Sequence, residues 1–103
     1  MSNVTVKLSQ PISAHGEEVS ELILREPTTE DVINMGQPFL IIARDGGESG
    51  IEIRSNVIAK YVSGLAAIPM SSVKKLSMKD FSVCQTAVMG FFGTGDGDGT
   101  TAS

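Results

Sequence analysis

Residues 20–31 read S-E-L-I-L-R-E-P-T-T-E-D, a stretch that predicts a strand followed directly by a helix. The apolar run in its first half favours an extended chain. Pro27 biases the residue before it towards extended geometry, and the Thr-Thr-Glu-Asp that follows supplies a hydroxyl N-cap and first-turn acids. Gly36 and Pro38 then stop the helix by about Met35. This order of signals predicts an α+β fold.

The chain before this stretch has the period of two that is typical of a strand with one buried face. Val4, Val6 and Leu8 alternate with polar residues. The Ala14-His15-Gly16 segment interrupts the alternation, and a second apolar run that ends at Leu24 follows it. Two such runs joined by a short Gly-containing segment predict an N-terminal β-hairpin.

The middle of the chain carries a second hairpin signal and then a helix signal. The apolar segments 39–43 and 51–53 flank Asp45-Gly46-Gly47, which predicts a small hairpin. From residue 55 onward the apolar period becomes helical, with Ser55 or Asn56 available as the N-cap. The residues that recur at helical intervals are Val57, Ile58, Tyr61, Val62, Leu65 and Ala66.

Further helix signals precede the end of the chain. Pro69 ends the previous helix, Ser71 is placed to cap a short turn, and Ser77 with Asp80 resembles a capping box that opens a last helix. We thus expect three or four short helices in one domain over residues 1–92, and a disordered Gly/Asp-rich tail over 93–103. The apolar stripe of the last helix is formed by Phe81, Cys84, Val88, Phe91 and Phe92.

Composition and charge exclude several classes of function. The formal net charge of −4, without a basic block, argues against a nucleic-acid partner. No apolar run approaches the ~18 residues that span a bilayer and the N-terminus lacks a signal-peptide layout, so a cytosolic protein without membrane contact is expected. A single cysteine and a single histidine exclude an internal disulfide and a histidine-rich metal centre.

No motif in the chain points to catalysis. Asp96-Gly97-Asp98-Gly99 lacks the later acidic ligand that a calcium loop needs, and neither a phosphate loop nor a nucleophile elbow occurs. Cys84 lies on an apolar helical face, where a free cysteine acts as a small hydrophobic side chain. We therefore expect no cofactor, no metal and no enzymatic activity.

Phe91 and Phe92 are the residues that best indicate a binding site. They are consecutive, so they point in different directions at the end of the last helix, and both cannot easily face one small core. Met89 lies beside them, and methionine adapts readily to different partners. The sequence therefore predicts an apolar anchor or groove for a segment of another protein at this end of the helix.

The chain also resembles the tail assembly chaperone family of Mu-like and related contractile-tailed phages. The resemblance rests on an ordered set of short motifs over about residues 4–92. Leu8-Ser-Gln-Pro-Ile12 and Gly16-Glu17 precede the run Leu22-Ile-Leu-Arg-Glu-Pro-Thr-Thr-Glu-Asp31. Downstream come Tyr61-Val62, Leu65-Ala-Ala-Ile-Pro69, Leu76-Ser77 with Asp80-Phe81, and Met89-Gly-Phe-Phe92.

The resemblance implies a protein of a phage or prophage that binds the tape measure protein and keeps it soluble while the tail tube assembles. It would act in the host cytoplasm and be absent from the mature virion. Such families commonly make a longer form by programmed ribosomal frameshifting, and the extension would add a contact with the tail-tube protein. The codons of Phe91 and Phe92 can form the run of uridines that such slippage requires.

Binding to such a client is expected to be hydrophobic, because a tape measure protein is a long, largely helical chain with much apolar surface. A structural tail-completion or connector protein, which would persist in the virion, is the alternative to a chaperone. The candidate contacts are Leu22, Leu24, Val88, Met89, Phe91 and Phe92.

Overall fold

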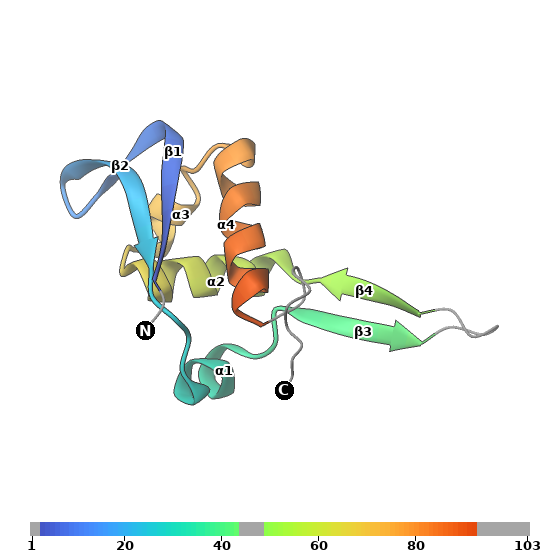
Figure 1. The fold of residues 1–103 in the computed structure, drawn as a ribbon. Coiled ribbons are helices and arrows are strands. Elements are labelled where there is room, and N and C mark those ends of the chain that lie inside the picture. Colours follow the sequence, from blue (N-terminus) through green and yellow to red (C-terminus); the bar gives the residue numbers. More distant parts are fainter. Residues whose placement is uncertain (1–2, 44–48, 93–103) are drawn as a thin grey trace.

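The computed structural model describes residues 3–43 and 49–92, which form two two-stranded antiparallel sheets and four helices (Figure 1). This result confirms the predicted α+β class, both hairpins and the helices. The predicted Asp45-Gly46-Gly47 turn and the predicted disordered tail over 93–103 lie outside the described residues. The single domain over residues 1–92 stays a prediction.

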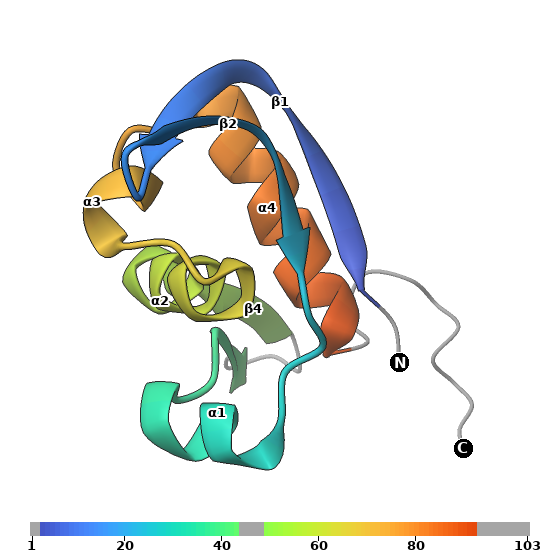
Figure 2. The same cartoon turned by 90° about the vertical axis from the view of Figure 1, so that its left-hand side faces the viewer.

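The N-terminal hairpin is strongly bent. Its strands β1 (Val4–Ala14) and β2 (Glu17–Leu24) pair antiparallel, with a register shift between residues 7 and 12 that marks a β-bulge. His15 and Gly16 join the strands with positive φ angles of 54° and 79°, as a tight type I′ hairpin turn requires. Because the strands are bent, the hairpin arches over the last helix, α4 (Figure 2).

The core lies between this hairpin and two helices. The helix α2 (Ser55–Ala66) packs against β2, α4 (Met78–Phe91) packs against β1, and the two helices contact each other. Val6 and Leu24 face inwards while Ile23 faces outwards, which is the period of two that the sequence predicted. The buried apolar side chains are Val6, Ile12, Ala14, Leu22, Leu24, Val57, Ile58, Tyr61, Val62, Leu65, Ile68, Val73, Cys84 and Val88.

The first helix, α1 (Thr29–Met35), begins and ends where the sequence predicts. Thr28 is the N-cap and forms a capping box with Asp31, so the first-turn acid satisfies a backbone N–H at the helix start. Gly36 is the C-cap with a φ of 86°, a conformation that glycine adopts without strain. The Tyr61 hydroxyl donates a hydrogen bond of 2.7 Å to the Gly36 carbonyl, which fixes the end of α1 on α2.

Two predicted helix caps are wrong. The N-cap of α2 is Arg54 rather than Ser55 or Asn56, and no side chain caps it. The chain enters α2 directly from a strand, because the Arg54 N–H donates to the Pro38 carbonyl at 2.9 Å across the second hairpin. The short helix α3 (Met70–Val73) starts from Pro69 rather than from Ser71.

The second hairpin extends away from the rest of the structure (Figure 1). Its strands are β3 (Phe39–Ala43) and β4 (Ser49–Ile53), with Phe39 opposite Ile53. Among the described residues neither strand pairs with a third strand. A two-stranded sheet of this kind is marginally stable alone, so the contacts at its base decide how it is held.

Candidate functional site

Half of the predicted contact residues lie inside the core. Leu22 is 3% exposed, and Leu24 and Val88 are fully buried. Leu22 and Leu24 point inwards from β2, and Val88 lies on α4. Their side chains are therefore inaccessible to another protein in this fold and belong to the core.

The other predicted contacts gather at the C-terminal end of α4. Met89, Phe91 and Phe92 are half-buried and pack against the core from outside. The Phe92 ring lies edge-on to the Tyr61 ring at 5.6 Å and edge-on to the Phe39 ring at 6.2 Å. Edge-to-face geometry at these distances is favourable, so Phe92 joins α4, α2 and the base of the β3–β4 hairpin.

Two well-exposed apolar side chains of the β3–β4 hairpin were not among the predicted contacts. Ile51 is 56% exposed and Ile53 is 41% exposed. Ile53 lies opposite Phe39 in the register, and Ile51 is two residues before Ile53 in β4, so all three side chains lie on one face of the sheet. We call these three residues together with Phe92 the hairpin strip.

A signal for the hairpin strip is nevertheless present in the sequence. In segment 39–43 every residue is apolar, so both faces of that strand are apolar. In segment 51–53 the two isoleucines lie on one face and Glu52 on the other. A two-stranded sheet has two faces, and a short chain cannot cover both of them. Leu40, on the opposite face beside Glu52, is itself 37% exposed.

Other exposed apolar side chains are scattered over separate elements and form no comparable face. Ile33 on α1 is 75% exposed, Met78 at the start of α4 is 82% exposed, and Ile23 and Val83 are about half exposed. Single exposed apolar residues are common on protein surfaces and need no function. Ile33 and Met78 are therefore suitable positions for control substitutions.

Arg25 and Asp31, whose pKa values are shifted, form an ion pair where β2 leads into α1. Arg25 donates to both carboxylate oxygens of Asp31, at 2.8 and 3.2 Å, and Thr28 donates its N–H to the same carboxylate at 2.8 Å. Arg25 is the largest cause, with Thr28 next, of a fall in the pKa of Asp31 from 3.8 to about 2. The ionised form of Asp31 is thus part of the junction between β2 and α1.

Asp80 stabilises the β1 bulge in the same way. Its carboxylate accepts the Ser9 N–H at 2.9 and 3.0 Å and the Gln10 N–H at 3.3 Å. These bonds, that of Ser9 first, lower the pKa of Asp80 although burial acts to raise it. Half of the predicted capping box is present, because Ser77 Oγ accepts the Asp80 N–H at 3.1 Å. The other half is replaced by the contact with β1.

Neither the thiol nor the acidic residues form a reactive centre in the described part of the chain. Cys84 is fully buried on the inner face of α4, and burial raises the pKa of its thiol to about 11. Within residues 3–43 and 49–92, no three His, Cys, Asp or Glu side chains come together as a metal site. No helix of that part is long and apolar enough to cross a bilayer.

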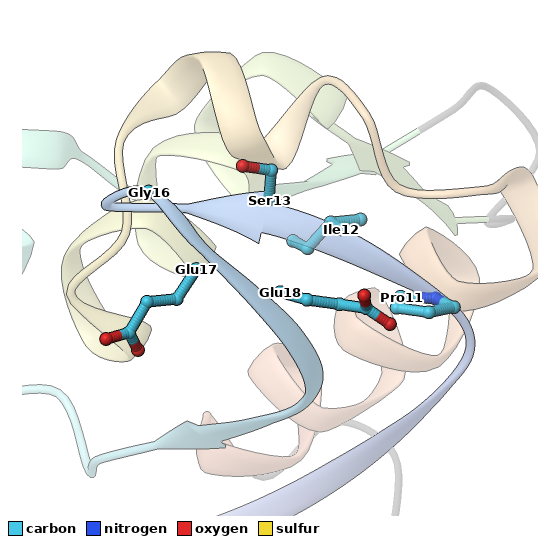
Figure 3. A pocket seen from close by; sticks show the side chains of 6 residues that line it. All are labelled: Pro11, Ile12, Ser13, Gly16, Glu17 and Glu18. Atoms are coloured by element: carbon cyan, nitrogen blue, oxygen red, sulfur yellow. The ribbon is translucent and has the colours of Figure 1, made fainter.

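A shallow hollow of about 370 Å³ lies in the bend of the N-terminal hairpin (Figure 3). It is bordered by backbone and by side chains that show no pairing of a nucleophile with a base. Ser13 contributes its carbonyl to the packing of α3, because Ser72 Oγ donates to that oxygen at 2.7 Å. The lining residues are Pro11, Ile12, Ser13, Gly16, Glu17 and Glu18.

An exposed apolar face next to a well-packed core is typical of a protein that binds other proteins. The comparison with protein families identifies the class more closely. Residues 5–93 match the family described as "Phage tail assembly chaperone proteins, E, or 41 or 14". The chain belongs to this family, as the resemblance in the sequence indicated. No curated protein and no solved structure matches the chain.

Family membership establishes the general activity. The family is one of tail assembly chaperones and is non-enzymatic, in agreement with the expected absence of a reaction. A tail assembly chaperone binds tail proteins, and it acts in the host, where tails are assembled.

Proposed function

We propose that this chain binds the tape measure protein and keeps it soluble until the tail tube polymerises around it. The observation that carries this proposal is the apolar surface formed by the end of α4 and the β3–β4 hairpin in a member of this family. A long helical client with apolar stripes self-associates in water unless those stripes are covered. Covering them temporarily is the task that this surface fits.

The proposed contacts follow from burial. Met89, Phe91 and Phe92 retain exposed area and are kept as contact residues. Leu22, Leu24 and Val88 are kept as the buried support beneath them. Replacing a support residue would unfold the surface together with the core, whereas replacing a contact residue would change binding.

We further propose that the protein acts in the host cytoplasm and leaves before the virion is complete. Mass spectrometry of purified virions tests this point against the alternative of a tail-completion or connector protein. We expect the tape measure protein to be detected and this chain to be absent. Stoichiometric recovery of the chain from virions would favour the structural alternative.

The longer form remains part of the proposal. A slip at the codons of Phe91 and Phe92 would change the chain directly after α4, so an extension would start next to the apolar surface. Such an extension would supply the contact with the tail-tube protein. The coding sequence tests this idea, because it must contain a slippery heptamer at these codons and an open reading frame beyond them.

Co-expression tests the central claim. The tape measure protein of the same phage is produced in cells with and without this chain, and its soluble fraction is measured. We expect it to be largely insoluble alone, and to become soluble and co-purify with the tagged chain. Equal solubility without the chain, together with no co-purification, would contradict the proposal.

A further inference from the structure

We infer that the hairpin strip is the docking surface for one amphipathic helix of the client, an inference that rests on the proposed function. The strip runs without a charged side chain from Phe92, across Phe39 and Ile53, to Ile51. The charged residue of β4, Glu52, lies on the opposite face of the sheet, paired with Leu40. The occupant must therefore present an uncharged, apolar face.

The spacing of the hairpin strip suits a helix. The Phe92 and Phe39 rings are 6.2 Å apart, and Ile53 and Ile51 are one two-residue step, roughly 7 Å, apart along β4. Each spacing is close to the ~6 Å that separates residues i and i+4 along a helix. Three apolar residues spaced as i, i+4 and i+7 or i+8 on one helix would contact the phenylalanines, Ile53 and Ile51 in turn.

A tail protein, rather than a second copy of this chain, is the occupant that the observations favour. The chain belongs to a family that acts on tail proteins, so a partner with apolar surface is present whenever the chaperone works. The strip also includes Phe92, which directly follows α4 and is one of the residues for which the sequence predicted a partner contact. Self-association through the same face is treated as an outcome of the test.

Peptides of about 20 residues that tile the tape measure protein are the probes. Binding to the full chain is measured by fluorescence anisotropy, and peptide helicity is followed by circular dichroism. We expect a peptide with an i, i+4, i+7 apolar stripe to bind and to gain helix. Because the strip carries no charge, its affinity should change less than about twofold between about 0.05 and 0.5 M NaCl.

Substitutions in the hairpin strip provide the decisive comparison. Ile51→Asp and Ile53→Asp should each weaken binding at least about tenfold, since each places a charge in a contact that buries an isoleucine. The matched controls Ile33→Asp and Met78→Asp, at exposed apolar positions of α1 and α4, should stay within about twofold of wild type. Ile51→Thr keeps the β-branched side chain that favours a strand, and should weaken binding about threefold even if the aspartate variants unfold the hairpin.

The outcomes separate this inference from the proposed function. If the wild type binds tape measure peptides and all strip variants bind equally well, the strip is not the docking surface although the chaperone function stands. A wild type that is a dimer, and that Ile51→Asp turns into a monomer with unchanged peptide binding, also overturns the inference. If no tape measure segment binds the wild type, the proposed function itself is wrong.

Discussion

Asp80 shows how a single side chain joins distant parts of this fold. It belongs to the first turn of α4, and its carboxylate accepts backbone N–H groups of Ser9 and Gln10 in the β1 bulge. The bulge leaves these N–H groups without a partner on β2, so the carboxylate accepts the hydrogen bonds that a strand carbonyl would otherwise accept. The Ser77-Asp80 pattern predicts the local cap, but nothing in the sequence relates Asp80 to residues about 70 positions earlier.

Asp80→Asn should destabilise the fold more than Ser77→Ala. An asparagine offers one acceptor oxygen and turns an N–H donor towards other donors, so at least one bulge N–H loses its partner. Ser77→Ala removes only the local cap of α4. We expect the melting temperature of Asp80→Asn to fall by at least ~4 °C, measured by calorimetry at neutral pH. A smaller fall than that of Ser77→Ala would contradict this role.

Asp31 should make stability depend on pH in the acid range. Its pKa is about 2 in the folded chain against an ordinary value of 3.8, so the ionised form stabilises the fold. This contribution is complete above about pH 4 and is lost as the pH falls towards 2. Asp31→Asn should therefore lower the urea midpoint at neutral pH, and its difference from wild type should shrink between about pH 4 and 2.

The control for this measurement is the wild type itself, because Asp80 also has a lowered pKa and titrates in both proteins. Only the difference between the urea midpoints of wild type and Asp31→Asn, followed as a function of pH, reports the contribution of Asp31. The unfolding is followed by far-ultraviolet circular dichroism, since the chain has no tryptophan. A difference that stays constant from neutral pH down to about 2 would show that Asp31 acts without its charge.

Cys84 should be inert to thiol reagents in the folded chain. The side chain is fully buried and burial raises the pKa of its thiol to about 11, so little thiolate forms near neutral pH. We expect modification by an aromatic disulfide reagent only as fast as the fold opens, and fast modification in urea. Rapid reaction of the native chain would mean that α4 separates readily from β1 and α2.

At the scale of elements, the two hairpins carry similar local signals and have different surroundings. Both have apolar runs on either side of a glycine-containing segment of the sequence, and both were predicted from it. The N-terminal hairpin places its inward face on α2 and α4, whereas the β3–β4 hairpin contacts the rest through Phe39 at its base. Strand periodicity predicts that a face is apolar, but the tertiary arrangement decides whether that face is covered.

The helix boundaries illustrate the same limit. α1 has a Thr-Asp capping box and a terminal glycine, so local chemistry defines both of its ends. α2 starts from Arg54, whose N–H is already bonded across the β3–β4 hairpin, and the serine and asparagine that follow are within the helix. Where a long-range hydrogen bond sets the start of a helix, local cap preferences mislead.

Phe92→Ala should loosen the β3–β4 hairpin more than Phe91→Ala. Phe92 makes edge-on contacts with Tyr61 and Phe39, and each such pair contributes roughly 0.5–1.5 kcal/mol. Both substitutions remove a half-buried phenyl ring, so Phe91→Ala is the control for the loss of a ring at this end of α4. We expect faster hydrogen exchange of the β3 and β4 amides in Phe92→Ala, with the exchange of β1 and α2 little changed. Equal exchange in both variants would show that the ring contacts of Phe92 do not hold the base of the β3–β4 hairpin.

At the scale of the whole molecule, the sequence identified the apolar residues but could not divide them between core and surface. Leu24 and Val88 were candidate contacts and are fully buried, whereas Ile51 was not a candidate and is more than half exposed. In a short chain nearly every large apolar residue is compatible with the core. Only the packing shows that α2, α4 and the first hairpin complete a core without β4.

The chain ending at Phe92 should fold as well as the full chain, because the sequence places no core residue beyond that position. Removing residues 93–103 takes away two aspartates and no large apolar side chain, and we expect the melting temperature to change by less than about 2 °C. A chain ending at Gly90 is the matched control, since it also loses Phe91 and Phe92 and with them the contacts to Tyr61 and Phe39. It should melt several degrees lower and bind the client weakly, whereas the 1–92 chain should bind as the full chain does. If the 1–92 chain is destabilised as much as the shorter one, the tail belongs to the folded unit and the boundary at residue 92 is wrong.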